Sequence, residues 1–216
     1  MAKHIIIGNS VSLIETLDLL GGRLCLDFTN TMDPRIGEHP RELLNAYPDL
    51  VVWSQHASVL TQEQSNNLLH DAQNRFEEAT EVFKNAIVLR ESLYGMFSTL
   101  ATGGEPHRAD MENVRRMFAS AMTYARLSHV QKQFTWEWDE HQDRLDCMMW
   151  PIVCSAVSVL TSEEWQRVKQ CPGLDDCGWL FLDTSKNGSR QWCSMQACGS
   201  RAKMRRQYAR KRTDRL

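Results

Sequence analysis

Four cysteines near the end of the chain have the residue type and spacing of a metal site. Cys171 and Cys177 are separated by five residues, Cys193 and Cys198 by four, and fifteen residues lie between the two pairs. Thiolates are the ligands that tetrahedral Zn²⁺ prefers, and four of them fill its coordination shell. The spacing therefore predicts one structural zinc ion, with no position left for water or substrate.

Disulfides and ordinary buried cysteines are the alternatives to a metal site. Disulfides need an oxidising compartment. The apolar run at 5–7 is too short for the core of a signal peptide, and no stretch approaches membrane-spanning length. We therefore expect a cytoplasmic protein with reduced thiols and no membrane segment. The other cysteines, Cys25, Cys147 and Cys154, are expected to be buried or free thiols.

The segment between the cysteine pairs is expected to form a β-hairpin. Its aromatic-rich arms, 178–183 and 190–193, flank Asn187-Gly188, a pair that accepts the positive φ of a tight turn. The predicted order of knuckle, hairpin and helix is treble-clef-like. So small a module buries too little apolar surface to fold alone, and zinc would contribute on the order of 10 kcal/mol. Without metal the module is expected to melt.

The residues around this metal site are strongly basic. Residues 186–216 contain ten lysines and arginines against one acid, a formal charge of +9. The whole chain carries −2, so residues 1–185 carry −11. Cations favoured by a helix dipole explain only a few of the ten. A basic tail on an acidic body is typical of proteins that bind nucleic acid.

Residues 198–212 are expected to form one helix with cations on two sides, and Cys198, Ala202 and Ala209 share a stripe suited to pack on the hairpin. This helix offers few base readers beyond Gln207, Arg206 and Arg210, so no target sequence is specified. Five phosphate contacts would make log affinity fall with log salt at a slope near −4.5, at about 0.9 per contact. The candidate DNA-binding residues are Lys186, Arg190, Arg201, Lys203, Arg205, Arg206 and Arg210.

Several motifs resemble known families. The runs CGWLFLD at 177–183, WCSM at 192–195 and CGSRAK at 198–203 are similar to the bacterial CGNR zinc finger, named for a Cys-Gly-Asn-Arg tetrad. Ser200 stands where that family has Asn. The run GGRLCLDFTNT at 21–31 resembles the opening of the ABATE domain, described as a stress-induced transcription regulator. The resemblance implies a DNA-binding regulator of the stress response.

The body that precedes the finger is predicted to be mainly helical. Apolar residues recur at helical spacing over 76–100, and glycines and a proline at 103–106 end that helix. Further helices are predicted at 111–121 and 145–160. The fold class is mainly α (α+β), with a helical domain at 1–165 that carries a small β-hairpin and a treble-clef-like zinc finger at 166–216.

Two local patterns refine this prediction. Aromatic and polar residues alternate at 134–138 after an extended segment at 125–130, which indicates the hairpin of the body. Trp136 and Trp138 share one face of it and are expected to lie in a core or an interface. The patterns Thr61-x-x-Gln64 and Thr161-x-x-Glu164 each predict a capping box at the start of a helix.

No catalytic motif accompanies these elements. The sequence has no phosphate-binding glycine loop, no His-Glu-x-x-His and no Gly-x-Ser-x-Gly, and its seven histidines do not pair on a helical face. We therefore expect no enzyme activity. One cluster of short polar side chains is a candidate pocket for a small effector, although caps and Asx-turns explain it equally. Its residues are Arg23, Asp27, Asn30 and Thr31.

The leading interpretation is a cytoplasmic transcription regulator whose zinc module docks on DNA. Its helical body would sense an effector or form a homodimer, because one small finger reads few base pairs. Two alternatives stay open. The finger is an RNA- or protein-interaction module, which the acidic body masks by folding onto it, or the body is an enzyme of unknown chemistry.

Overall fold

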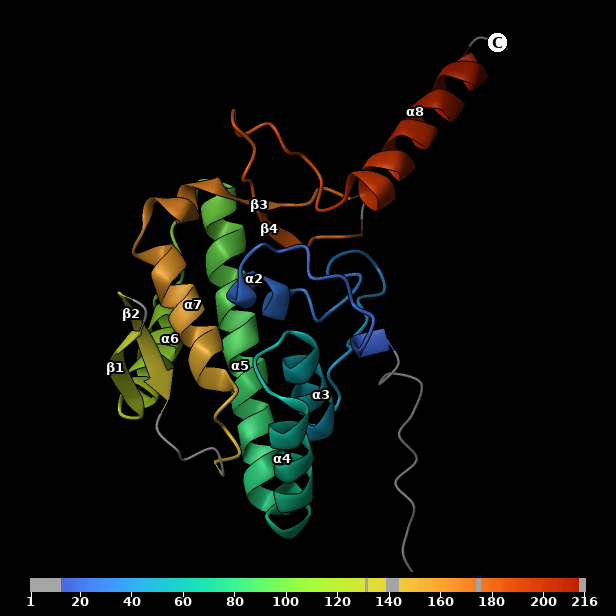
Figure 1. Ribbon diagram of the computed structural model, residues 1–216. Coiled ribbons are helices and arrows are strands. Elements are labelled where there is room, and N and C mark those ends of the chain that lie inside the picture. The colour runs from blue at the N-terminus through green and yellow to red at the C-terminus, as the bar shows by residue number, and fades with distance from the viewer. Residues whose placement is uncertain (1–12, 131, 139–143, 174–175, 214–216) are drawn as a thin grey trace, which may run out of the picture.

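The computed structural model describes residues 13–130, 132–138, 144–173 and 176–213. Helices make up most of it, with two small antiparallel hairpins, which confirms the predicted mainly α class (Figure 1). A 3-10 turn at Glu163–Arg167 and a π-helical turn at Met195–Gly199 connect elements in the last third. The helices and strands are α2 Leu24–Thr29, α3 Tyr47–His56, α4 Gln62–Asn74, α5 Phe76–Ala101, α6 Arg108–Met122, β1 Ala125–Val130, β2 Gln133–Trp138, α7 Met149–Leu160, β3 Val168–Gln170, β4 Leu180–Leu182 and α8 Ser200–Thr213.

Helix α5 is the central element of the body, and it confirms the helix predicted at 76–100. It contacts helices α2, α3, α4, α6 and α7 as well as strand β3. Leu89, Leu93 and Phe97 on its inner face are fully buried. The helix ends where Thr102 caps it and Gly103 turns the chain with φ +78°. Its upper end also supports the finger, so one helix spans body and metal site (Figure 1).

One of the two predicted capping boxes is present. Thr61 Oγ1 accepts a hydrogen bond from Gln64 N, and the Gln64 side chain accepts from Thr61 N. The second prediction is wrong, because Thr161 is still attached to the end of α7 and its hydroxyl donates to Val157 O at 2.7 Å. Ser162 caps the following turn instead, accepting from Glu164 N.

The hairpin predicted at 125–138 is confirmed as strands β1 and β2, which pair in antiparallel register with Leu127 opposite Trp136. Its two tryptophans differ in environment. The Trp138 ring lies 5.6 Å from the Trp150 ring of α7, whereas Trp136 is 49% exposed. The hairpin is therefore anchored at its base and open to solvent further out.

The hairpin of the finger forms in a different place from the predicted one. Strand β3 pairs with β4, so the two arms enclose the first cysteine pair rather than Asn187-Gly188. The latter segment is a turn closed by Gly188 N donating to Ser185 O. The prediction failed for two reasons. Strand β3 is only three residues long and shows no alternation of apolar and polar residues. The segment expected as the second arm is held by a hydrogen bond to the buried carboxylate of Asp183, described below.

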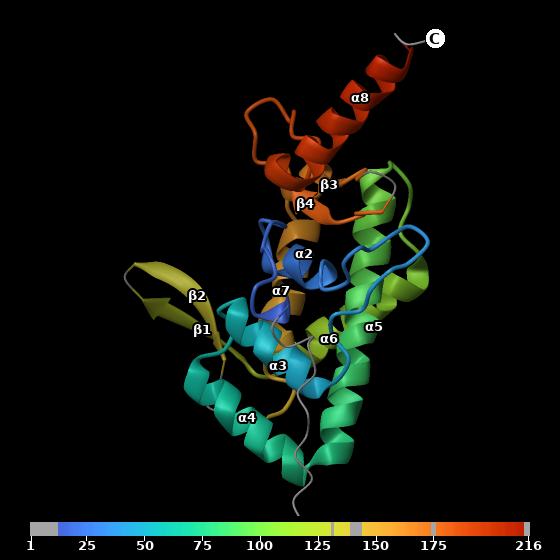
Figure 2. The ribbon, with the colours of Figure 1, turned by 90° about the vertical axis from the view of Figure 1, so that its right-hand side faces the viewer.

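The finger packs into the body. Val168, Leu180 and Leu182 belong to the main hydrophobic core, together with residues of α2, α5 and α7. Leu182 N donates to Gly21 O at 2.8 Å, so β4 also bonds to the segment before α2. Strands β3 and β4 thus lie across one end of the body, and α8 projects away from it (Figures 1 and 2).

Candidate metal centre and nucleic-acid interface

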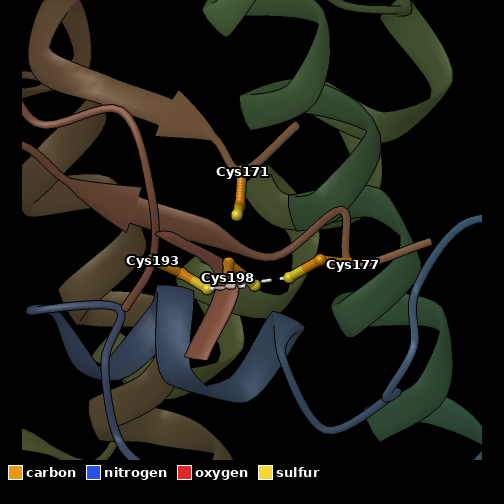
Figure 3. Close-up of side chains that lie close together, drawn as sticks. All are labelled: Cys171, Cys177, Cys193 and Cys198. Carbon is orange, nitrogen blue, oxygen red and sulfur yellow. Dashed lines mark hydrogen bonds between the residues drawn. The ribbon is translucent and has the colours of Figure 1, made fainter. Parts of the chain in front are cut away.

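The four predicted cysteine ligands converge at one point, although they come from four separate segments. Cys171 directly follows β3, Cys177 lies in the knuckle between the strands, Cys193 lies in the loop after β4, and Cys198 lies in the π-helical turn before α8. All four are buried, and their sulfurs lie within 4.8 Å of one another (Figure 3).

The geometry of the cluster fits a tetrahedral zinc ion. A Zn–S distance of about 2.3 Å gives sulfur–sulfur edges of about 3.8 Å. The Sγ atoms of Cys177 and Cys193 are 3.6 Å apart, and so are those of Cys193 and Cys198. Four thiolates complete the shell of one ion, so the site is structural.

The thiols interact strongly with one another. Hydrogen bonding with Cys171 raises the pKa of Cys177 well above its usual range, and Cys193 and burial add to the effect. The bonds from Cys177 and Cys193 hold the pKa of Cys171 low. These thiols therefore do not ionise independently of one another. A divalent cation bound in place of their protons satisfies all four sulfurs.

Two glycines allow the tight knuckle that carries Cys177. Gly173 and Gly178 have φ values of +52° and +67°, which residues with side chains rarely adopt. A Cβ on Gly173 would lie 2.6 Å from the Cβ of Cys177, and one on Gly178 would lie 2.7 Å from the Ile36 side chain. Both positions therefore need glycine for conformation and for space.

The body clamps this knuckle from outside. Arg35 N donates to Cys177 O at 2.9 Å, and Ile36 N donates to Asp176 O. The buried Arg35 guanidinium lies 3.8 Å from the centre of the Tyr94 ring and is paired with Glu91. Tyr94 Oη in turn donates to Gly178 O. Helix α5 and the loop before α3 thus help to position a metal ligand.

Asp183 organises the loop between β4 and Cys193, and the sequence prediction missed it. Its fully buried carboxylate accepts hydrogen bonds from Ser185 N, Arg190 N and Lys169 Nζ. Burial opposes ionisation, but the Lys169 and Ser185 donors outweigh it and hold the pKa of Asp183 below its usual range. An acid that ends an apolar strand with a serine two residues later is an Asx-turn pattern that sequence analysis could have found.

Arg190 is held inside the finger and does not point to solvent. Its guanidinium donates to the carbonyls of Leu20, Leu182, Trp192 and Cys193 and lies 4.4 Å from the centre of the Phe181 ring. It therefore joins the Cys193 loop to the body. We accordingly leave Arg190 out of the DNA-contacting set.

Lys186, by contrast, is exposed at the turn, which gives a matched pair of variants. Arg190→Ala should lower the free energy of unfolding by about 3 kcal/mol, because several carbonyls lose a charged donor, and leave the salt dependence of DNA binding unchanged. Lys186→Ala should leave stability within about 0.5 kcal/mol and reduce the salt slope by about 0.9. Urea unfolding and binding titrations measure both. Equal effects from the two variants would contradict the assignment.

Helix α8 presents cations along its described length. Arg201, Lys203, Arg205, Arg206 and Arg210 are exposed, and no acid occurs between Ser200 and Thr213. Of the predicted packing stripe, Cys198 and Ala202 are buried, and the side chain of Ala209 lies outside the described residues. The helix therefore attaches to the metal site by its first turn and extends into solvent (Figure 2).

A hollow of about 540 Å³ lies along one side of this helix. Lys203, Arg206 and Arg210, at positions i, i+3 and i+7, form its cationic wall together with Gln207. Trp192 and Met195 form part of the facing wall. The structure thus brings three predicted DNA-binding residues and a base reader onto one side of the helix, beside an aromatic ring.

Family comparisons match both parts of the chain. The family model ABATE, "Putative stress-induced transcription regulator", matches residues 22–163, which is more than half of the chain. The chain belongs to the ABATE family. The CGNR zinc finger model matches residues 167–211. Both resemblances seen in the sequence are therefore confirmed, and both families are of regulator or zinc-finger type. None of the curated proteins compared matches the chain.

In this ABATE protein the residues at the positions of the CGNR tetrad, 198–201, each have a structural role. Cys198 is a ligand, Gly199 packs closely against Met195 and Trp192, and Arg201 donates to the Cys198 sulfur at 3.2 Å. Ser200, at the position of the family's Asn, donates its hydroxyl to Met195 O. The tetrad therefore joins the metal site to the first turn of α8.

The candidate effector residues of the ABATE domain are bound internally. Arg23 pairs with Glu164, Asp27 accepts from Gly21 N, and Thr31 Oγ1 accepts from the buried Arg90. Asn30 bonds both the N–H and the C=O of Leu180 in β4, each at 2.9 Å. None of the three hollows found among the described residues is lined by these four residues. Asn30 connects the ABATE domain to the finger, and the other three bond to residues outside the finger.

Asp27 gives a prediction for pH. Burial raises its pKa to about 6, against opposing contributions from Gly21 N and His56. A raised pKa means that this carboxyl contributes stability when protonated, which is lost as pH rises from about 4 through about 6. The variant Asp27→Asn cannot titrate. Its stability relative to the wild type should rise by about 3 kcal/mol between pH 4 and 7, measured by urea unfolding at each pH. If the difference in free energy of unfolding between the two proteins stays constant with pH, the pKa of Asp27 is not raised in the folded protein.

The described helices include none that is both long enough and apolar enough to cross a membrane.

Proposed function

We propose that this protein is a DNA-binding transcription regulator in which the zinc site holds α8 in position to lie in a groove of duplex DNA. The observation that carries the proposal is α8 itself, a projecting helix that begins at a metal ligand and bears cations without acids. The major groove of B-DNA, about 12 Å wide, admits an α-helix. The description of the ABATE family supports a regulatory role.

The side of α8 that faces the hollow is the proposed contact surface. Lys203, Arg206 and Arg210 line it at helical spacing, so they can follow one phosphate backbone. Gln207 lies among them and is the residue type that pairs with adenine in the major groove. Arg201, Arg205 and Lys186 would add contacts at the edges.

A salt titration tests this proposal. The triple variant Lys203→Ala, Arg206→Ala, Arg210→Ala should bind duplex DNA more weakly, and the slope of log affinity against log salt should become less steep by about 2.7. The control replaces three exposed cations of the body, Lys84, Arg108 and Arg115, with alanine and makes the same change in net charge. Fluorescence anisotropy with labelled duplex measures both. Equal loss in the two variants would show that only net charge matters.

Single-stranded RNA is the second candidate partner. Trp192 beside the cationic wall favours it, because an aromatic ring next to cations suits the stacking of unpaired bases. Competition by RNA against labelled duplex separates the two. The masked state, in which the acidic body covers the basic helix, receives no support from the structure, since α8 projects away from the body (Figure 1).

The remaining parts of the proposal concern the ABATE domain. We assign the protein no catalytic step, because both of its families are of regulator or zinc-finger type and four thiolates leave the metal site no open position. Reduced thiols suit a cytoplasmic regulator. A single finger reads few base pairs, so we infer that two copies act together. The residues first proposed for an effector pocket are occupied by internal contacts, of which that of Asn30 reaches the finger, and they do not support such a pocket.

A further inference from the structure

The hairpin β1–β2, here called the arm (residues 125–138), leaves an apolar face in solvent. Its register places Leu127 opposite Trp136 and His129 opposite Phe134, so these side chains share one face. Leu127 is 61% exposed, Phe134 73% and Trp136 49%. Together they expose on the order of 300 Å² of apolar surface. A contiguous patch of that size on a soluble domain commonly marks an interaction site.

The arm is anchored to the body at its base, although its apolar face is exposed to solvent. At its base Trp138 contacts Trp150, and Tyr124 stacks on Trp150 with ring centres 4.6 Å apart. Beyond that point the arm projects sideways from the helices (Figure 2). An anchored arm presents its face in a fixed orientation, which lowers the entropy lost when something binds.

A hollow of mixed polar and apolar lining lies beside the base of the same arm. It has a volume of about 370 Å³; Gln64 and Glu137 give it polar groups, and its other lining residues are Val59, Leu60, Trp136, Trp138, Cys147, Trp150 and Pro151. The molecule therefore carries an exposed apolar projection and a partly apolar recess next to each other. Two copies related by a two-fold axis can each place the projection in the other's recess, because such an interface uses the same surface on both partners.

Charge favours a second copy as the occupant. The arm carries Arg126, Lys132 and Glu137 as its formal charges, a net +1, whereas residues 1–185 as a whole carry −11. The arm is therefore opposite in sign to the body of a second copy, which favours their contact. In a two-fold pair each partner buries both its arm face and its recess, which brings the area per partner above that of the arm face alone and toward the roughly 800 Å² of a standard interface.

We propose that this protein forms a homodimer in which the arm of each copy lies in the recess between the arm, α7 and the loop after α3 of the other. The inference stands on the arm alone and does not depend on DNA binding. A dimer of this kind would leave both α8 helices free, since the arm and α8 lie at different ends of the body (Figure 1).

Sedimentation equilibrium of the zinc-loaded full chain tests the dimer. The wild type should be dimeric at micromolar concentration, and Phe134→Glu should weaken dimerisation by roughly 30-fold or more, as loss of an aromatic anchor does. Phe76→Glu is the control, because Phe76 is 74% exposed at the start of α5, away from the arm. It should leave the dimer intact. Both variants should keep the wild-type melting temperature at concentrations where all three proteins are monomeric, since the replaced side chains are exposed.

A photoreactive phenylalanine analogue at position 134 tests where the arm binds on the other copy. Cross-links between copies should map to residues 59–64 or 147–151. A wild type that stays monomeric at high concentration overturns the proposal, and so does a Phe134→Glu variant that dimerises as tightly as Phe76→Glu. Cross-links elsewhere on the partner would likewise overturn the proposed seat.

Discussion

The substitution Cys193→Ser should release α8 while leaving the finger strands folded. Cys193 links the loop after β4 to the other three sulfurs, and a structural zinc site contributes about 10 kcal/mol or more to the segment that it closes. A helix that must be ordered on binding loses about 2–5 kcal/mol of affinity. Duplex DNA affinity should therefore fall by roughly 30-fold or more.

Hydrogen exchange measured with and without chelator distinguishes this outcome from general unfolding. Amides of the π-helical turn, such as Gly199 N bonded to Ser194 O, should lose protection. Leu180 N and Leu182 N should keep it, because their acceptors, Asn30 Oδ1 and Gly21 O, belong to the body.

The variant Cys154→Ser is the control for Cys193→Ser, since Cys154 is a half-buried thiol of α7 outside the cluster. It should bind DNA as the wild type does. If the β4 amides exchange together with those of α8, the finger folds as one metal-dependent unit and the body does not hold its strands.

The substitution Asn30→Ala should have the largest effect on stability of any single change between body and finger. Asn30 is buried, and its side-chain amide acts as a strand partner for both polar groups of Leu180. Removing it leaves a buried N–H and a buried C=O without partners, at about 1–3 kcal/mol each. We expect the free energy of unfolding to fall by about 4 kcal/mol.

Urea unfolding of the zinc-loaded protein measures this loss. Asn30→Asp should not rescue it, because a carboxylate accepts from Leu180 N but repels Leu180 O. The control Asn67→Ala, at an exposed position of α4, should change stability by no more than about 0.5 kcal/mol. A small effect of Asn30→Ala would mean that water replaces the amide at this contact.

The contacts of Asn30 show what the sequence alone could not predict. Asn30 was grouped with Arg23, Asp27 and Thr31 as candidate pocket residues because short polar side chains follow an apolar run. The partner of Asn30, Leu180, and that of Arg23, Glu164, lie 150 and 141 positions away in the chain. No local pattern records a contact of that range, so a structural amide and a ligand-binding amide look alike in the sequence.

The sequence by itself determined the candidate metal ligands and the helices α5, α6 and α7 of the body, whereas α2 and α3 were not predicted. Four cysteines in two close pairs specify a closed thiolate site because spacing and softness of the ligand are local properties. The periodicity over 76–100 specified α5 for the same reason. Charge asymmetry identified the basic end of the chain, because net charge needs no knowledge of the fold.

Only the tertiary structure decided which strands pair, that the Arg190 side chain turns inward, and how the body supports the finger. Strand β3 pairs with β4, and Arg190 turns inward to carbonyls from three segments. Both outcomes follow from burial of Asp183 and from the core shared by β4 and the body. A buried polar group must find partners wherever the fold supplies them, and those partners are set by packing between segments that are distant in the sequence.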